Sequence, residues 1–462
     1  MGIPVREHRD FATTPPPHCE AVPHIWSRFV DAFVDFAVGG HVLAGRAKDS
    51  PRWTQPVQSG AFDPATDQSG SSNVDRAAKP EILESSVTRD RETNSVNQAD
   101  SVSPGDTDGP PPLATVLPAA DRVVAIGDIH GDISKARQAL RTAGLIDGQD
   151  RWTGKSTVLV QVGDLLDRGG QELAVVYLFE KLRREARQAG GAVHVLLGNH
   201  ETGNFEGWFR YSTREGRRDF QRWAAWERLG VGFRAACEGG RVSPDPLASV
   251  SERVRPELRA RMAALSPGSP LLQRFFAGNP SVLRLGSTVF VHGGLLPEHV
   301  QYGLERINRE GQEWILSPAR RPDGLPERGP HFFHTKNAVV WVREYSHTDP
   351  SICDCRLLER TLEMLPGSMR MVMGHTIQQP GGINATCKGK AIRVDVGMSE
   401  GCGGAEAEIL EIRKDREVWV VRAAEEAAGK PPKAHVLAGT EVPADKHGFW
   451  EKLREAMGTR VA

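Results

Sequence analysis

Turns that contain glycine recur along this chain at a nearly constant interval, and this spacing constrains the fold more than any other feature. They begin at Gly127, Gly163 and Gly198, and each follows a run of apolar residues. The interval of roughly 35 residues is the length of one strand followed by one helix, and repeated units of this kind place their strands parallel in a sheet. The sequence therefore predicts an α/β fold.

The segments around these turns predict further elements. Apolar residues with helical spacing predict helices at 133–143 and 171–189. Residues 405–424 predict a β-hairpin that turns at Lys414 and Asp415. Other apolar runs predict strands at 287–294, 337–344, 369–375 and 390–397.

The composition divides the chain into segments. Residues 118–424 have the pattern of a folded catalytic domain, in which the arginine- and tryptophan-rich residues 203–280 are expected to form a helical lid. Residues 45–117 are rich in proline, serine, aspartate, threonine and glycine, and they are expected to form a disordered linker. An N-terminal segment, 1–44, and a polar C-terminal tail, 425–462, complete the division.

Residues 25–38 in the N-terminal segment predict an amphipathic helix. Its polar face carries Arg28, Asp31 and Asp35, which is more acidic than the polar face of most helices that bind membranes. Docking of this helix on the chain's own catalytic domain is the preferred interpretation. Docking of a partner protein is the alternative.

Charge and hydropathy bear on the partners of this chain. Lys and Arg together number 58 and Asp and Glu 59, so the net charge of −1 gives no support for nucleic-acid binding. No stretch is apolar for long enough to span a bilayer, and so no transmembrane segment is expected. A cytoplasmic location is the default expectation, with an organelle such as a mitochondrion or chloroplast left open.

The six cysteines are scattered, and Cys353 and Cys355 form the only close pair. Two thiols cannot complete a four-ligand zinc site. Ordinary reduced thiols are therefore expected, with a redox role for this pair as the alternative.

Five of the predicted strands end in a turn with a residue that can bind a metal. The turns are GDIHG at 127–131, GDLLDRG at 163–169, GNHE at 198–201, VHGG at 291–294 and GHT at 374–376. Functional residues of an open α/β sheet collect beyond the carboxyl ends of its strands. The candidate metal ligands are Asp128, His130, Asp164, Asn199, His292 and His375.

The types of these ligands indicate the kind of metal centre. Carboxylate, amide and imidazole donors without a thiol suit Mn²⁺, Fe or Zn²⁺. Six ligands exceed what one ion with an open position needs, so we expect two divalent ions about 3.5 Å apart that share one carboxylate. Such a pair lowers the pKa of a shared water and makes hydroxide available near neutral pH.

Three further residues suit chemistry on a phosphate ester. The guanidinium of Arg168 can bind two phosphate oxygens. His200 directly follows Asn199, so it is expected just outside the metal ligands, where it can protonate a leaving oxygen. Asp167 can hold that imidazole in the required tautomer.

Any one of these turns alone could be ordinary, but all five in this order resemble the motifs of the phosphoprotein phosphatase (PPP) family. GNHETGNFEGWFRY, VVWVREYS and GHTIQ are similar to the Shewanella-like protein phosphatase branch of that family. The resemblance covers about residues 118–424. It implies a calcineurin-like metallophosphoesterase fold, with a central β-sandwich flanked by helices and a helical lid insertion.

The resemblance also implies individual roles. Asp128 and His130 would hold one ion, and Asp164 would bridge to the second. The second ion's remaining ligands would be Asn199, His292 and His375. Arg343 in VVWVREYS would join Arg168 in binding phosphate, with His200 as proton donor and Asp167 behind it.

The expected activity is one-step hydrolysis of phosphomonoesters on phosphoproteins, by direct attack of a metal-bridging hydroxide and without a covalent phosphoenzyme. Two alternatives remain open. One is a diadenosine-tetraphosphate hydrolase, which shares the turn motifs, and the other is a non-catalytic scaffold that binds phosphoproteins. Manganese is the expected metal, with iron or zinc as alternatives. The choice between phosphoserine, phosphothreonine and phosphotyrosine does not follow from these motifs.

Overall fold

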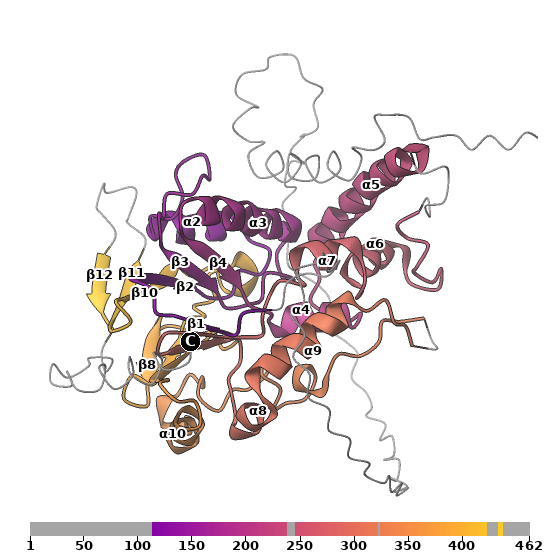
Figure 1. Cartoon of the computed structure of the whole chain (residues 1–462). Coiled ribbons are helices and arrows are strands. Elements are labelled where there is room, and N and C mark those ends of the chain that lie inside the picture. Colours follow the sequence, from indigo (N-terminus) through magenta and orange to yellow (C-terminus); the bar gives the residue numbers. More distant parts are fainter. Residues whose placement is uncertain (1–112, 238–244, 322–323, 423–432, 438–462) are drawn as a thin grey trace, which may run out of the picture. The chain divides into compact units, whose positions relative to one another are not determined.

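The computed structural model describes residues 113–237, 245–321, 324–422 and 433–437 (Figure 1). The predicted helix at 25–38 lies outside the described residues, as does the predicted linker up to residue 112.

Two six-stranded sheets form the centre of the described structure. Their strand orders are β12-β11-β10-β2-β3-β4 and β1-β5-β6-β7-β9-β8. The first sheet consists of β2 (Arg122–Ile126), β3 (Val158–Gln161), β4 (Ala192–Val195), β10 (Glu408–Arg413), β11 (Glu417–Arg422) and β12 (Lys433–Val436). The second consists of β1 (Val116–Leu117), β5 (Val282–Leu285), β6 (Thr288–Val291), β7 (Arg370–Met373), β8 (Asn384–Thr386) and β9 (Ala391–Arg393).

The pairing of the strands confirms the predicted strand–helix repeats. Strand β2 runs parallel to β3, and β3 runs parallel to β4. In the other sheet β6, β7 and β9 are also parallel neighbours. The predicted hairpin is confirmed as well, because β10 and β11 pair antiparallel and Lys414 and Asp415 between them have φ of 49° and 55°.

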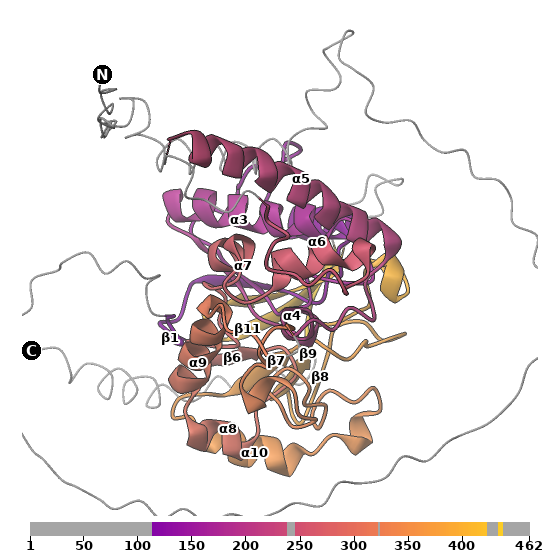
Figure 2. The ribbon, with the colours of Figure 1, turned by 90° about the vertical axis from the view of Figure 1, so that its right-hand side faces the viewer.

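Helices cover both sheets. Helices α2 and α3 pack on the first sheet and α9 on the second, so the sheets lie between helical layers (Figure 2). The fold is therefore α/β, as predicted. The helices are α2 (Ile133–Thr142), α3 (Glu172–Gln188), α4 (Asn199–Phe205), α5 (Arg214–Cys237), α6 (Pro256–Leu265), α7 (Pro270–Phe275), α8 (Pro297–Tyr302), α9 (Leu304–Leu316) and α10 (Cys355–Glu363).

The lid region and the surface bear on further expectations. Helices α5, α6 and α7 all fall within 203–280, where a helical lid was predicted.

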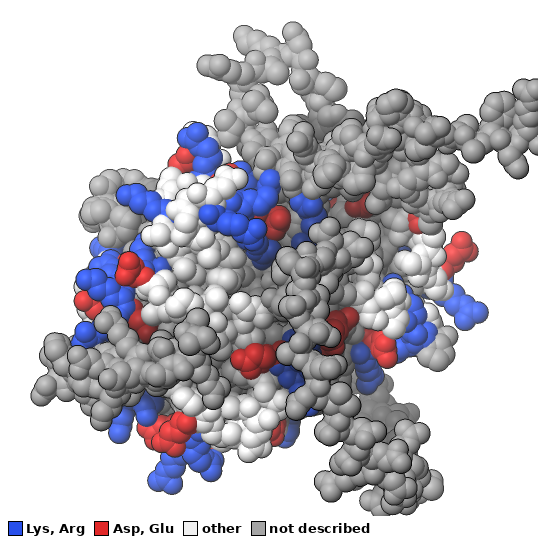
Figure 3. Space-filling view, viewed as in Figure 1, with Lys and Arg blue, Asp and Glu red and all other residues white. Residues whose placement is uncertain are grey.

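Within the described parts of the chain, no helix has the length and apolar character that crossing a membrane requires. Basic and acidic side chains are interspersed on the face drawn in Figure 3, which is therefore not uniformly basic.

The strand predicted at 337–344 is wrong, because this segment folds into turns. The Trp341 N–H donates to the Ala338 carbonyl over 2.8 Å. The Val339 carbonyl accepts from Gly293 N–H over 3.0 Å, which packs the segment against the turn after β6. Its apolar residues are buried in this packed turn, so hydrophobicity alone indicated a strand that backbone pairing does not form.

Two short strands extend the sheets beyond residues 118–424. Val116 and Leu117 pair as β1 with β5, although they were assigned to the linker. Lys433–Val436 pair as β12 with β11, although they were assigned to the polar tail. Two residues are too few for Val116–Leu117 to show an alternation, and the alternation of Lys433–Val436 covers only four, so backbone pairing with a neighbouring strand places each.

The expectation of reduced thiols is wrong for two cysteines, because Cys355 and Cys387 form a disulfide. The close pair Cys353 and Cys355 does not bond to itself. Cys353 is free and buried, and its thiol donates to the Tyr345 carbonyl. A disulfide is typical of oxidising compartments, and the compartment of this chain stays a prediction.

Reduction of this disulfide is expected to destabilise the fold. The bond closes a loop between residues separated by 32 positions. Its loss should lower the free energy of unfolding by about 4 kcal/mol, because the unfolded chain gains freedom. Thermal unfolding with and without reductant measures this effect. The reductant should lower the Tm of the wild type and of Cys402→Ser but not of Cys355→Ser/Cys387→Ser, and an unchanged wild-type Tm would contradict the expectation.

Candidate metal centre and active site

The ends of β2, β3, β4, β6 and β7 bring the predicted site residues together, except Arg343, which comes from the packed turn at 337–344. Eight of them line a single pocket, with His292 and Asp167 directly behind it, in contact with Asp164 and His200 respectively. The lining residues are Asp128, His130, Asp164, Arg168, Asn199, His200, Tyr211, Trp341, Arg343, His375, Ile377 and Asp395.

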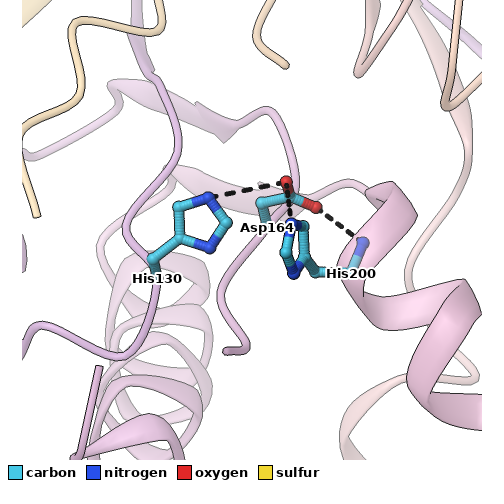
Figure 4. A group of neighbouring side chains, drawn as sticks. All are labelled: His130, Asp164 and His200. Carbon is cyan, nitrogen blue, oxygen red and sulfur yellow. Dashed lines mark hydrogen bonds and ion pairs between the residues drawn. The ribbon is translucent and has the colours of Figure 1, made fainter. Parts of the chain in front are cut away.

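The carboxylate of Asp164 lies at the centre of the cluster. Its Oδ2 atom is 3.7 Å from His130 Nε2, 3.8 Å from His200 Nε2 and 3.3 Å from His292 Nε2. Figure 4 shows His130 and His200 on either side of it. Asp164 belongs to two groups of close ligand-type atoms, one with His130 and His200 and the other with His292 and His375. A carboxylate common to both groups fits two ions that share it, with His200 beside the first group as the predicted proton donor rather than a ligand.

The histidines turn a ring nitrogen toward this cluster, and His292 Nε2 also lies 2.9 Å from Asn199 Oδ1, a second proposed ligand. The Nδ1–H of His130 donates to the Leu166 carbonyl and that of His292 to the Val162 carbonyl, both over 2.9 Å. Each imidazole is thereby fixed with Nε2 toward Asp164, as second-shell bonds fix metal-binding histidines. His375 Nε2 is buried and has no hydrogen-bond partner among the described residues. An orphaned imidazole nitrogen beside carboxylates fits a metal ligand.

The buried carboxylates of the pocket also favour the binding of cations. Burial, reinforced by the carboxylates of Asp395 and Asp164, raises the pKa of Asp128 well above its ordinary value. Burial likewise raises the pKa of Asp395 to about 6. The pKa of Asp164 is held well below its usual range by His292 and His200 although burial opposes this. Three carboxylates in one pocket repel each other, and divalent cations relieve that repulsion.

Burial lowers the pKa of His130 to about 4 and that of His375 well below its ordinary value. Both imidazoles are therefore neutral at pH 7, and the neutral imidazole is the form that binds a metal. The donor set of oxygen and imidazole ligands without a thiol fits a dinuclear site for divalent ions.

The backbone holds these side chains in sparsely populated conformations. The φ angles of His130, Asp164 and His375 are 47°, 58° and 68°. Left-handed residues other than glycine concentrate at functional sites, where the surrounding structure enforces them. Gly163, with φ of 103°, is packed against Gly198, and a side chain there would collide with the backbone of the next turn.

Glu201 braces the turn that carries Asp164. Its buried carboxylate accepts the N–H groups of Asp164, Leu165 and Gly198 over 2.7, 2.9 and 2.8 Å. Burial, then the neighbouring Asp164, raises the pKa of Glu201 to about 7. The sequence analysis quoted Glu201 within GNHE but gave it no role.

His200 and Asp167 form the predicted pair. The distance from His200 Nδ1 to Asp167 Oδ2 is 2.8 Å, so Nδ1–H donates to the carboxylate and Nε2 faces Asp164. The backbone N–H of His200 donates to Asp164 Oδ1 over 2.9 Å. The pair is buried beside the cluster, where an acid for a leaving oxygen is needed.

Both predicted arginines line the pocket. The Arg168 guanidinium lies 4.9 Å from the centre of the Tyr211 ring, and its Nε has no partner among the described residues. Arg343 Nη1 donates to Thr376 Oγ1 over 2.7 Å and to the His375 carbonyl over 3.2 Å. Two cations therefore border the metal-ligand cluster.

Four lining residues were missed from the sequence, among them Ile377, which lies two positions after His375. Asp395 follows β9 in the same strand–turn pattern as the predicted ligands, so its position in VDVG could have revealed it. Tyr211 comes from the lid region and Trp341 from the packed turn at 337–344. Neither stands at a strand end, and no local pattern marks them.

Comparison with known proteins assigns this geometry to a family. Residues 121–376 match the calcineurin-like phosphoesterases. The chain belongs to that family. It is 41% identical, over 87% of its length, to Shewanella-like protein phosphatase 2 of Arabidopsis thaliana and covers 88% of that protein. The predicted resemblance to the Shewanella-like branch is thus confirmed.

More distant relatives agree. Shewanella-like protein phosphatase 1 of Plasmodium berghei is 26% identical over 60% of this chain and 67% of that protein. The crystal structure of a cold-active protein-tyrosine phosphatase from a psychrophilic Shewanella species superimposes with a TM-score of 0.50 and 21% identity. That superposition covers 70% of this chain and 82% of the other. At this identity it shows the fold alone, and the predicted calcineurin-like fold is confirmed.

Replacement of Asp164 tests the shared-carboxylate site. Asp164→Asn is expected to lose bound divalent metal and phosphatase activity together, because an amide cannot bridge two cations as a carboxylate does. Metal content by plasma mass spectrometry measures this. Asp354→Asn is the matched control, since Asp354 caps α10 away from the pocket and asparagine caps a helix equally well. Two retained ions in Asp164→Asn would refute the bridging role.

Proposed function

We propose that this metal-dependent phosphatase hydrolyses phosphomonoesters on phosphoproteins, with manganese as the preferred metal. The observation that carries the proposal is the buried His200–Asp167 pair, with a 2.8 Å contact, beside the Asp164 cluster. A binding scaffold has no need of a proton donor at this place. The pair therefore favours catalysis over the scaffold alternative.

The metal ligands divide into two sets. Asp128 and His130 would hold one ion, and Asp164 would be shared with the second. Bound divalent ions lower the pKa of water and neutralise phosphate oxygens. The second ion would take Asn199, His292 and His375.

The remaining residues act on the substrate. Arg168 and Arg343 bind phosphate oxygens from the rim of the pocket. His200 protonates the oxygen that leaves as the ester bond to phosphorus breaks, and Asp167 keeps Nδ1–H engaged so that the proton is delivered from Nε2. No residue that lines the described pocket is a serine, threonine or cysteine, and this supports attack by water rather than by a hydroxyl or thiol of such a residue.

The aromatic rings at the pocket support phosphotyrosine as the preferred substrate. Tyr211 lies 5.1 Å from the His200 ring and 5.3 Å from the Trp208 ring, between ring centroids. Trp341 lies 5.5 Å from the His375 ring on another part of the wall. Aromatic walls stack on a phenyl ester better than on the short side chain of serine or threonine. Docking of a partner protein through the helix predicted at residues 25–38 and the cellular compartment both stay predictions.

A panel of substrates tests the proposed activity. With Mn²⁺, the purified chain is expected to hydrolyse phosphotyrosine peptides faster than phosphoserine or phosphothreonine peptides. Tyr211→Leu should lower the ratio of the phosphotyrosine rate to the phosphoserine rate. The substitution removes one aromatic ring from the pocket wall and leaves the metal ligands in place. Diadenosine tetraphosphate is the competing substrate, and its hydrolysis alone would favour the dinucleotide hydrolase.

His200→Asn separates chemistry from metal binding. Its kcat on phosphopeptides should fall by about 10²- to 10³-fold, because asparagine cannot donate the proton. Its metal content should equal that of the wild type, since His200 is outside the proposed ligand set. A kcat within a few-fold of the wild type would show that the leaving oxygen takes its proton elsewhere.

A further inference from the structure

A buried arginine of the lid donates hydrogen bonds to Asp167, the partner of the proposed proton donor His200. Arg261, in α6, has a side chain with 0% exposure. Its Nη2 donates to Asp167 Oδ1 over 2.8 Å. Nη1 and Nη2 together also donate to both carboxylate oxygens of Glu172, each over 2.7 Å. The guanidinium thus joins the lid to the carboxylate that holds His200.

The same guanidinium reaches His200 by a second route. Arg261 Nε donates to Asn204 Oδ1 over 2.8 Å, and this fixes which way the Asn204 amide faces. Asn204 Nδ2 then donates to Asp167 Oδ2 and to the His200 carbonyl, over 2.8 and 2.7 Å. Arg261 therefore controls both oxygens of Asp167, one directly and one through Asn204.

The arrangement locks the orientation of Asp167. Oδ1 accepts from Arg261, and Oδ2 accepts from Asn204 and from His200 Nδ1. A carboxylate held at both oxygens cannot turn about its side-chain bond. Without the arginine, Oδ1 would be buried without that charged donor, and only the bonds at Oδ2 would hold the carboxylate toward the imidazole.

We propose that Arg261 is a positioning residue for His200: by clamping Asp167, the lid sets the orientation of the imidazole that protonates the leaving oxygen. The inference rests on the proposed function, in which His200 is that proton donor. It gives the lid a part in proton transfer that is separate from covering the pocket.

Substrates that differ in the acidity of their leaving group distinguish a role in positioning His200 from a merely structural role. A phenol that is a weak acid needs a proton as it leaves, whereas p-nitrophenol leaves readily as an anion. Arg261→Met should therefore lower kcat for phenyl phosphate by about 100-fold but affect p-nitrophenyl phosphate far less. The KM of both esters should stay close to the wild-type value, because Arg168 and Arg343 still bind the phosphate.

Arg370→Met is the matched control. Arg370 in β7 is also buried, and its Nη2 donates to the Asp415 carbonyl over 2.9 Å, but it does not line the pocket. Its loss should change kcat for the two esters by the same factor. Arg261→Lys serves if Arg261→Met does not fold, because one ammonium cannot serve Asp167, Glu172 and Asn204 in the planar geometry of a guanidinium. It should show the same selective loss on phenyl phosphate.

A double variant tests the route through His200. If Arg261 acts through the imidazole, Arg261→Met should add nothing to the loss in His200→Asn on phenyl phosphate. Equal losses on both esters, or losses that multiply in the double variant, would overturn the inference while the proposed function stands. A wild type that hydrolyses neither these esters nor the phosphopeptides with Mn²⁺ would remove the proposed function itself, and the inference with it.

Discussion

The shared carboxylate of Asp164 is the constraint on which the rest of the site depends. It is 2% exposed, and its Oδ2 lies within 3.8 Å of imidazole nitrogens from three different turns. Its own backbone is left-handed, with φ of 58°, and its N–H is held by Glu201. The turns after β2, β3, β4 and β6 therefore meet at one atom, and a shift in any of them would disturb both ligand sets.

Several carboxylates are buried around Asp164 Oδ2, and each needs a cationic or hydrogen-bonding neighbour. A buried carboxylate is tolerated only when it is paired or coordinates a metal. Asp167 is paired with Arg261 and His200, whereas Asp128 and Asp395 face the pocket with raised pKa values. The protein thus separates Asp167, which orients the proposed proton donor His200, from the carboxylates proposed to bind cations. With this division, the strand ends of two ordinary sheets form the site of a metal-dependent hydrolase.

The parts of the site that follow strands were predictable from sequence pattern, whereas of the parts placed by tertiary packing only Arg343 was predicted, and that through the family resemblance. Asp128, Asp164 and His292 each end an apolar run, so the strand-end pattern identified them, and Asp395 follows the same pattern although it was overlooked. Arg261 and Tyr211 lie in the lid, where no local pattern shows which side chain turns toward the pocket. The disulfide joins residues from α10 and the end of β8, and that proximity arises only in the folded chain.

Anomalous diffraction from crystals grown with Mn²⁺ tests the central claim most directly. The account predicts two manganese peaks in the pocket, both bonded to Asp164. One should also be bonded to Asp128 and His130, and the other to Asn199, His292 and His375. A single peak, or two peaks that do not share Asp164, would contradict it.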